Sequence, residues 1–344
     1  MEITAEKIMQ QLHKGELAAS VIAVFGEEGY YKDKISVALP KAVFSEAAPE
    51  DREITVFERD TDMKELSAAI NTYPFFSGRS LVVIKDEKLW GGKDAGEKRK
   101  QQQEELAELL ADVPEHCQVL LLGEKIDKRS KLYKGLLKTA AMVECKPVKA
   151  YQLKPWLDDQ AALRGCRFDY EASQTIMEYL SVTDNAPLLL LEQEIEKLSV
   201  YAGERKIWTK DDVEQTFAAL PEVSRFALLN AIAEKRLGQT LERLGEERKH
   251  GNTVLALCGL ISFQVRRLGR VKELLEGRAS QAEIASELKA APFAVKKMVE
   301  QSRRFGLGEL ERALLELSQL NIEVRYGGRQ FEKLEEILIR LLSD

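Results

Sequence analysis

The sequence has few of the features that mark membrane proteins, secreted proteins or nucleic-acid coats. No apolar run approaches the roughly 20 residues that span a bilayer, and the acidic first residues do not have the layout of a signal peptide. The net charge is −6 at pH 7, which excludes a chain that coats nucleic acid through overall positive charge. Any contact with DNA therefore requires a local basic patch.

Cysteine and histidine are also scarce. No two cysteines stand at CxxC spacing and the three histidines add no cluster of ligands, so we expect neither a metal site nor a cofactor. Scattered, reduced cysteines are typical of cytoplasmic proteins. They are Cys117, Cys145, Cys166 and Cys258.

The composition favours a helix-rich protein of two or three domains. Its 344 residues are too many for a single core, and 31% of them are charged while only 7% are aromatic. Buried strands are expected at residues 21–25, 53–57, 81–84 and 119–122, alternating with amphipathic helices. This alternation predicts a doubly wound α/β domain, which we place at residues 1–146.

After Pro147 the β signal stops and the apolar spacing becomes helical. We expect a small helical domain at residues 147–219. From Pro221 long amphipathic periods predict an all-helical remainder over residues 220–344. Within the first domain, residues 91–105 are polar and charged, and we interpret them as a mobile loop ahead of a helix.

The segment Gly26-Glu27-Glu28-Gly29 lies between a strand and a helix, as a phosphate-binding loop does. Such a loop needs a lysine for the β- and γ-phosphates and a hydroxyl for magnesium. Here Glu27 and Glu28 would repel a triphosphate, and two tyrosines stand where the lysine and hydroxyl would help. The sequence therefore predicts a nucleotide-binding fold that binds no ATP at this loop.

Two adjacent aromatic residues, Phe75 and Phe76, come just before the strand expected at residues 81–84. They should therefore lie at the mouth of the parallel sheet. Large rings in such a place can each bury roughly 150–250 Å² in a partner's pocket, as interface hot spots do. The alternative is that one or both rings fold back and cap the sheet, as most aromatic residues next to a strand do.

Residues 280–297 have the pattern of a helix-turn-helix, with a capping box at residues 280–283. The first turn of the second helix holds Phe293, Ala294 and Val295, without the Asn, Gln or Arg that pair with bases. This favours a packing role over DNA reading. Nearby glutamates favour a solvated or acid-paired surface for the basic residues of this region, which are Arg266, Arg267, Arg270, Lys296, Lys297, Arg303 and Arg304.

A single residue is a better candidate for a contact with DNA. Tyr326 lies in a glycine-containing segment between Arg325 and Arg329. A ring on a flexible loop flanked by arginines can stack on an exposed base. The alternative is a loop tyrosine that covers a helix end.

The order and spacing of several blocks resemble the family of bacterial DNA polymerase III delta subunits. The resemblance covers nearly the whole chain. The blocks are residues 25–28, 75–79 with 81–83, 127–134, 194–198, 264–268, 284–297 and 303–305.

The resemblance implies a degenerate AAA+ module, made of the α/β domain and a helical lid domain, followed by a helical collar domain. It implies a clamp-loader subunit that binds the beta sliding clamp and helps to open it for loading onto primed DNA, without ATP hydrolysis of its own. The implied partners are the gamma/tau and delta prime subunits and primer-template DNA. The resemblance also implies that no membrane is involved and that the chain is a subunit of the cytoplasmic, nucleoid-associated DNA polymerase III holoenzyme, a nucleotidyltransferase.

The clamp-binding residues implied by the resemblance are Pro74, Phe75, Phe76, Ser77 and Arg79. The family commonly has Leu-Phe where this chain has the bulkier Phe75-Phe76. Arg79 either bonds the clamp at the rim of this contact or caps the local turn.

Two other functions compete with this interpretation. An active AAA+ ATPase of the helicase-loader type would need the phosphate-loop lysine that the chain lacks. A transcription regulator that used residues 280–304 would bind specific duplex DNA, with an affinity that falls steeply with salt.

Overall fold

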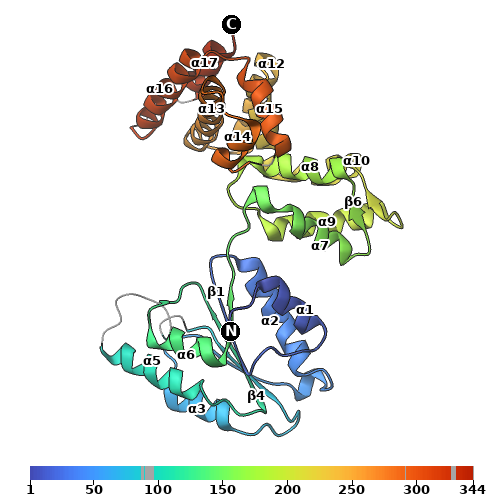
Figure 1. Ribbon diagram of the computed structural model, residues 1–344, viewed down its shortest axis with the longest axis vertical. Coiled ribbons are helices and arrows are strands. Elements are labelled where there is room, and N and C mark those ends of the chain that lie inside the picture. The colour runs from blue at the N-terminus through green and yellow to red at the C-terminus, as the bar shows by residue number, and fades with distance from the viewer. Residues whose placement is uncertain (87–88, 90–96, 291, 327–330, 344) are drawn as a thin grey trace. The chain divides into compact units, whose positions relative to one another are not determined.

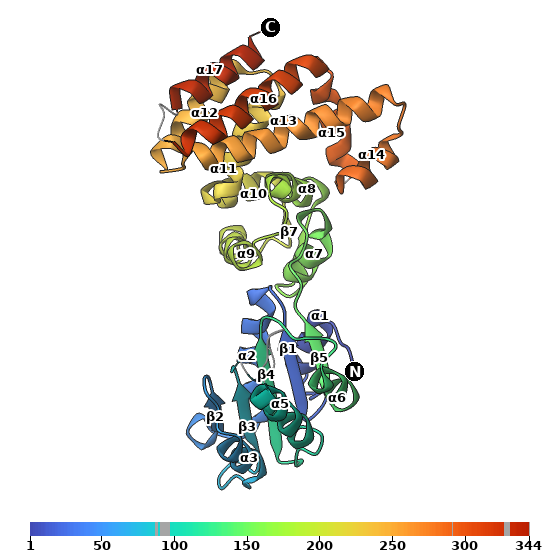
Figure 2. The same ribbon diagram turned by 90° about the vertical axis from the view of Figure 1, so that its left-hand side faces the viewer.

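The computed structural model describes residues 1–86, 89, 97–290, 292–326 and 331–343 (Figures 1 and 2). The chain forms two compact units, residues 1–147 and 148–344. The expected boundary between residues 219 and 220 stays a prediction. In the described part of the chain, no helix is both long enough and apolar enough to cross a membrane.

The first unit is built on a five-stranded parallel sheet with the strand order β2-β3-β4-β1-β5. Every residue of β1 and of β3 is buried, as their unbroken apolar runs predict. At one edge β2 has a single neighbour, and its central residues are exposed. The strands are β1 (Val21–Phe25), β2 (Glu53–Phe57), β3 (Ser80–Ile84), β4 (Cys117–Gly123) and β5 (Ala141–Glu144).

Helices cover both faces of this sheet, which confirms the predicted α/β architecture (Figure 2). Alternate strand residues, such as Val82 and Ile84, form one core with three helices on one face. Two helices that pack on each other cover the opposite face. The first three are α3 (Met63–Asn71), α5 (Glu97–Leu109) and α6 (Lys131–Thr139); the other two are α1 (Ala5–His13) and α2 (Gly29–Val43).

The expectation of a loop over residues 91–105 is wrong from residue 97 onward, where α5 begins. Residues 91–96 lie outside the described residues. Lys, Arg, Gln and Glu are good helix formers despite their polarity. The helix is held to the domain by Leu106 and by Leu110 just beyond its end, which are four residues apart and buried in the core.

The second unit is helical, as predicted, apart from one short strand pair that the sequence did not reveal. β6 (Arg167–Phe168) and β7 (Ile207–Trp208) pair in parallel. Trp208 is fully buried, and its ring meets that of Phe168 at a centroid distance of 5.0 Å. Two-residue strands are too short to show the alternation that marks a strand in a sequence.

The C-terminal part of this unit packs around the long helix α13 (Val254–Glu276). Its buried apolar residues recur on one side, which matches the amphipathic periods of the sequence. The other helices of the unit are α7 (Lys154–Ala162), α8 (Tyr170–Tyr179), α9 (Leu188–Ala202), α10 (Lys210–Thr216), α11 (Pro221–Ala233), α12 (Leu237–Lys249), α14 (Gln281–Leu288), α15 (Pro292–Ser302), α16 (Leu307–Val324) and α17 (Phe331–Leu342).

Candidate functional site

Phe75 and Phe76 project from the connection between α3 and β3. Their exposed fractions are 88% and 71%, so neither ring folds back to cap the sheet. The two rings contact each other edge to face at a centroid distance of 5.2 Å. Together they form an exposed aromatic pair, an arrangement suited to insertion into a partner's pocket.

The backbone beneath these rings is held by Glu53, the first residue of β2. One carboxylate oxygen of Glu53 accepts the backbone N–H of Phe75 at 2.6 Å and that of Phe76 at 3.0 Å. Charge-assisted bonds of this kind are stronger than neutral ones. Because the preceding residue Pro74 is buried and Glu53 holds both N–H groups, the aromatic pair stands on a fixed base.

Sequence reasoning missed Glu53, which is more than twenty residues away in the chain. It comes close because β2 and β3 pair in parallel with Glu53 opposite Ser80, the residue that ends the aromatic connection. Only the register of two strands reveals this contact, and no local motif encodes it.

The turn that follows the two rings is stabilised by Ser77 and Gly78 and not by the side chain of Arg79. Gly78 has a φ of +65°, and the hydroxyl of Ser77 donates to the carbonyl of Arg79. The guanidinium of Arg79 is exposed and makes no hydrogen bond or ion pair within the described residues. Arg79 therefore does not cap the turn, and its side chain is available to a partner.

The loop that resembles a phosphate-binding loop lies at the opposite edge of the same sheet. The aromatic pair comes before β3, whereas Gly26–Gly29 follows β1, and all five strands are parallel. Ligands of open α/β sheets bind at the carboxyl ends of the strands, so the loop has the location of a nucleotide site and the aromatic pair does not.

Two backbone N–H groups of this loop already donate to carbonyls of the chain. The N–H of Gly26 donates to the carbonyl of Glu124, and the N–H of Glu28 donates to the carbonyl of Cys145. Gly26 has a φ of +129°, and a side chain there would collide with the Cys145 carbonyl, so the loop is pressed against the end of β5. These N–H groups are not free to bind a phosphate.

A carboxylate also occupies the start of α2 next to this loop. The carboxylate of Glu28 accepts the N–H of Tyr30 at 2.9 Å and so caps the start of α2, where a phosphate would otherwise bind. The ammonium of Lys32 donates to the Gly26 carbonyl. Burial raises the pKa of the neighbouring Cys145 thiol to about 12, so this cysteine stays protonated and unreactive. Among the described residues, no three His, Cys, Asp or Glu side chains are grouped as a metal site.

The helix-turn-helix segment forms as expected, including the capping box between Ser280 and Glu283. Its second helix, α15, packs against other helices. Val295 is fully buried, Lys297 pairs with Glu178 of α8, and Gln301 bonds Asn230 of α11. The side chain of Phe293 lies outside the described residues. These contacts give α15 a packing role within its own unit.

Tyr326 lies at the end of α16 and is 87% exposed, so its ring does not cover the helix end. Arg325 beside it is also exposed. Arg329 lies outside the described residues.

We expect the substitution Glu28→Ala to loosen the start of α2. Losing an N-terminal cap costs about 1 kcal/mol, so the amides of the first turn should exchange about fivefold faster with deuterium. Glu27→Ala is the matched control, because Glu27 is exposed and makes no hydrogen bond or ion pair among the described residues. Equal exchange in the two variants would contradict the capping role. Neither variant should hydrolyse ATP, because the loop still lacks its lysine.

Comparisons with known proteins agree with this geometry. The family model "DNA polymerase III, delta subunit" matches residues 23–146, and "DNA polymerase III delta subunit, C-terminal domain" matches residues 222–341. The DNA polymerase III subunit delta of Bacillus subtilis is 29% identical over 340 residues, which are 98% of this chain and 96% of that protein.

A solved structure is similar over the same extent. The Bacillus subtilis DNA clamp loader delta protein is 26% identical, with a TM-score of 0.61 over 99% of this chain and 100% of that chain. The resemblance and the fold class expected from the sequence are confirmed. This chain belongs to the family of DNA polymerase III delta subunits, a family of clamp-loader proteins.

Proposed function

We propose that this chain binds the beta sliding clamp through Phe75 and Phe76 and helps to open the ring for loading onto primed DNA. The observation that carries the proposal is the exposure of both rings, 88% and 71%, on a base held by Glu53. Two adjacent exposed rings are costly to keep in water unless a partner covers them. Pro74, Ser77 and Arg79 complete the proposed contact.

The fixed base of the aromatic pair favours tight binding. Association loses free energy whenever a loop must become ordered, and a loop that is already held loses less. The two N–H bonds from Phe75 and Phe76 to Glu53 order the backbone in the free subunit. The rings can then enter a clamp pocket with little rearrangement.

Ring opening follows from differential binding and needs no covalent chemistry. A subunit that binds the open or relaxed clamp more tightly than the closed one shifts the ring toward opening. The loop at Gly26–Gly29 lacks the phosphate-binding lysine and its Gly26 and Glu28 N–H groups are already bonded, so the energy of ATP would come from other subunits.

We propose that these other subunits are gamma/tau and delta prime. In this arrangement residues 1–146 bind the clamp, residues 147–219 form a lid domain, and residues 220–344 join the collar of the loader. Packing of α15 within its own unit fits a structural role for the helix-turn-helix segment.

We also propose that Tyr326, with Arg325 and Arg329, contacts primer-template DNA in the assembled loader. The exposed ring of Tyr326 supports stacking on an unpaired base.

The double variant Phe75→Ala/Phe76→Ala should lose binding to the clamp. Hot-spot aromatics contribute at least about 2 kcal/mol, so the affinity should fall about 30-fold or more. Calorimetric titration of the purified chain with the clamp measures this loss of affinity. The control Tyr170→Ala/Tyr201→Ala removes two exposed rings of the second unit, which are 70% and 56% exposed. If both double variants bind like the unaltered chain, the clamp contact lies elsewhere.

Removing the carboxylate of Glu53 should weaken binding to the clamp, although both aromatic rings remain in the chain. We expect Glu53→Ala to lower the affinity about fivefold, since a charge-assisted bond contributes about 1 kcal/mol or more. Glu53→Gln keeps an acceptor oxygen and should lie between the two. Glu58→Ala, which removes an exposed glutamate just after β2, is the control. Unchanged affinity in Glu53→Ala would show that the base of the rings orders itself without it.

Tyr326→Ala should weaken primer-template DNA binding by the assembled loader. Loss of one base stack costs about 1–3 kcal/mol, which corresponds to roughly tenfold in affinity. Fluorescence anisotropy of labelled DNA measures the change, with Tyr170→Ala as the control. Identical affinities would place the DNA away from the end of α16.

A further inference from the structure

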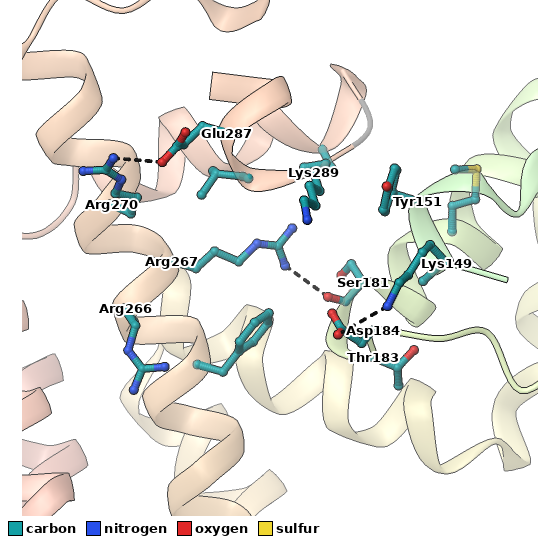
Figure 3. A pocket seen from close by; sticks show the side chains of 16 residues that line it. Lys149, Tyr151, Ser181, Thr183, Asp184, Arg266, Arg267, Arg270, Glu287 and Lys289 are labelled. Atoms are coloured by element: carbon teal, nitrogen blue, oxygen red, sulfur yellow. Dashed lines mark hydrogen bonds and ion pairs between the residues drawn. The ribbon is translucent and has the colours of Figure 1, made fainter. Parts of the chain in front are cut away.

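A cavity of about 450 Å³ opens within the second unit, remote in sequence from the residues proposed to bind the clamp (Figure 3). Its walls come from residues 149–151, the end of α8 with residues 181–184, α13, the end of α14, and α15. Pockets of 300–1,000 Å³ are typical of small-molecule sites. The cavity is therefore large enough for a nucleotide.

Basic side chains outnumber acidic ones around this cavity. Two of the five basic residues form ion pairs. Arg270 pairs with Glu273 and Glu287, and the Nζ of Lys149 lies 3.6 Å from a carboxylate oxygen of Asp184. The other three basic residues have no carboxylate partner among the described residues: Arg266, Arg267 and Lys289. Positive charge thus remains unbalanced at this cavity.

Arg267 carries this charge into the interior. It is partly buried; its guanidinium donates one hydrogen bond to the Ser181 carbonyl, at 3.0 Å, and its carbon lies 5.6 Å from the ring centre of Phe263. Burial lowers its pKa, which means that the charged form has lost favourable hydration. A guanidinium has five N–H donors, so most of them are left for an anion.

A second cation points into the same space. Figure 3 shows Lys289 extending from the end of α14 toward the guanidinium of Arg267, with Tyr151 on the far side of the cavity. Lys289 makes no hydrogen bond or ion pair among the described residues and ends α14 with a φ of +48°. Like charges that face each other repel, and a shared anion would remove that repulsion.

We propose that this cavity binds a nucleotide, with its phosphate between Arg267 and Lys289. Planar guanidinium groups match the geometry of phosphate oxygens, and the aromatic ring of Tyr151 offers a surface for the base. A pocket of about 450 Å³ accommodates one nucleotide, whereas an acidic peptide would need a longer groove. The nucleotide is either free or part of single-stranded DNA, because both present the same phosphate and base.

Two probes separate these sources. A fluorescent ADP analogue and a fluorescein-labelled oligothymidylate of ten nucleotides are titrated separately into the full-length chain. Binding of ADP alone, or of both probes, would support a site open to free nucleotides, and binding of the oligonucleotide alone would support a DNA contact. Binding of neither probe would overturn the proposal.

Variants place the binding at this cavity. Arg267→Gln and Lys289→Glu should each lower the affinity about tenfold, as expected for the loss of a charge-assisted bond to phosphate. Lys289 is exposed, so its variant should fold normally even if Arg267→Gln is unstable. Lys296→Glu is the matched control, since Lys296 is exposed on α15 and does not line the cavity. An equal loss of probe affinity in Lys289→Glu and Lys296→Glu would overturn the assignment. Displacement of both probes by hexaglutamate at equal charge concentration would also overturn it, because any polyanion would then bind.

Discussion

Burial of β1 and β3 on both faces is the constraint on which the first unit depends. Helical crossovers between these strands cover both faces of the sheet, and strands that are joined by crossovers run parallel. All strands then begin at one edge of the sheet and end at the other. That polarity separates the aromatic pair, which lies before β3, from the closed loop, which lies after β1.

Because β1 ends at the edge where α2 begins, the loop at Gly26–Gly29 lies at a helix start, and the chain itself satisfies the polar groups there. An N-terminal helix end and a glycine turn attract anions whatever the protein does with them. In this chain the Glu28 carboxylate lies at the helix start where an anion would bind, and the Cys145 carbonyl accepts the N–H of Glu28. The positive end of the α2 dipole and the Glu28 N–H are therefore satisfied by groups of the chain, and no phosphate is needed to stabilise them.

Much of the fold could be predicted from the sequence because its signals are local. The strands at residues 21–25 and 53–57 were predicted with their observed bounds, since apolar runs between charged or glycine-containing segments define them. The capping box at Ser280 is a four-residue pattern and was also found. Signals fail where few residues carry them: β6 and β7 have only two residues each, and α5 is polar along most of its length.

The candidate site divides in the same way. Phe75 and Phe76 could be found because two adjacent rings before a buried strand are conspicuous in sequence. Their exposure could not be decided there, because an aromatic residue next to a sheet is as well suited to capping it. Glu53 was not found at all. Its role exists only once β2 lies beside β3 in the observed register, which is a property of the sheet and not of any short segment.

The order and exposure of the aromatic pair affect how the proposed clamp binding could be controlled. Exposed rings that are already ordered need no conformational change to bind, so their affinity cannot be switched by local folding. In the proposed function, control of clamp binding would then come from access, meaning whether other subunits cover or uncover Phe75 and Phe76. An inert phosphate loop and a rigid, exposed aromatic pair are therefore consistent with each other. In the proposed function, the loop gives the chain no switch of its own, and the aromatic pair is a binding surface that only neighbouring subunits would regulate.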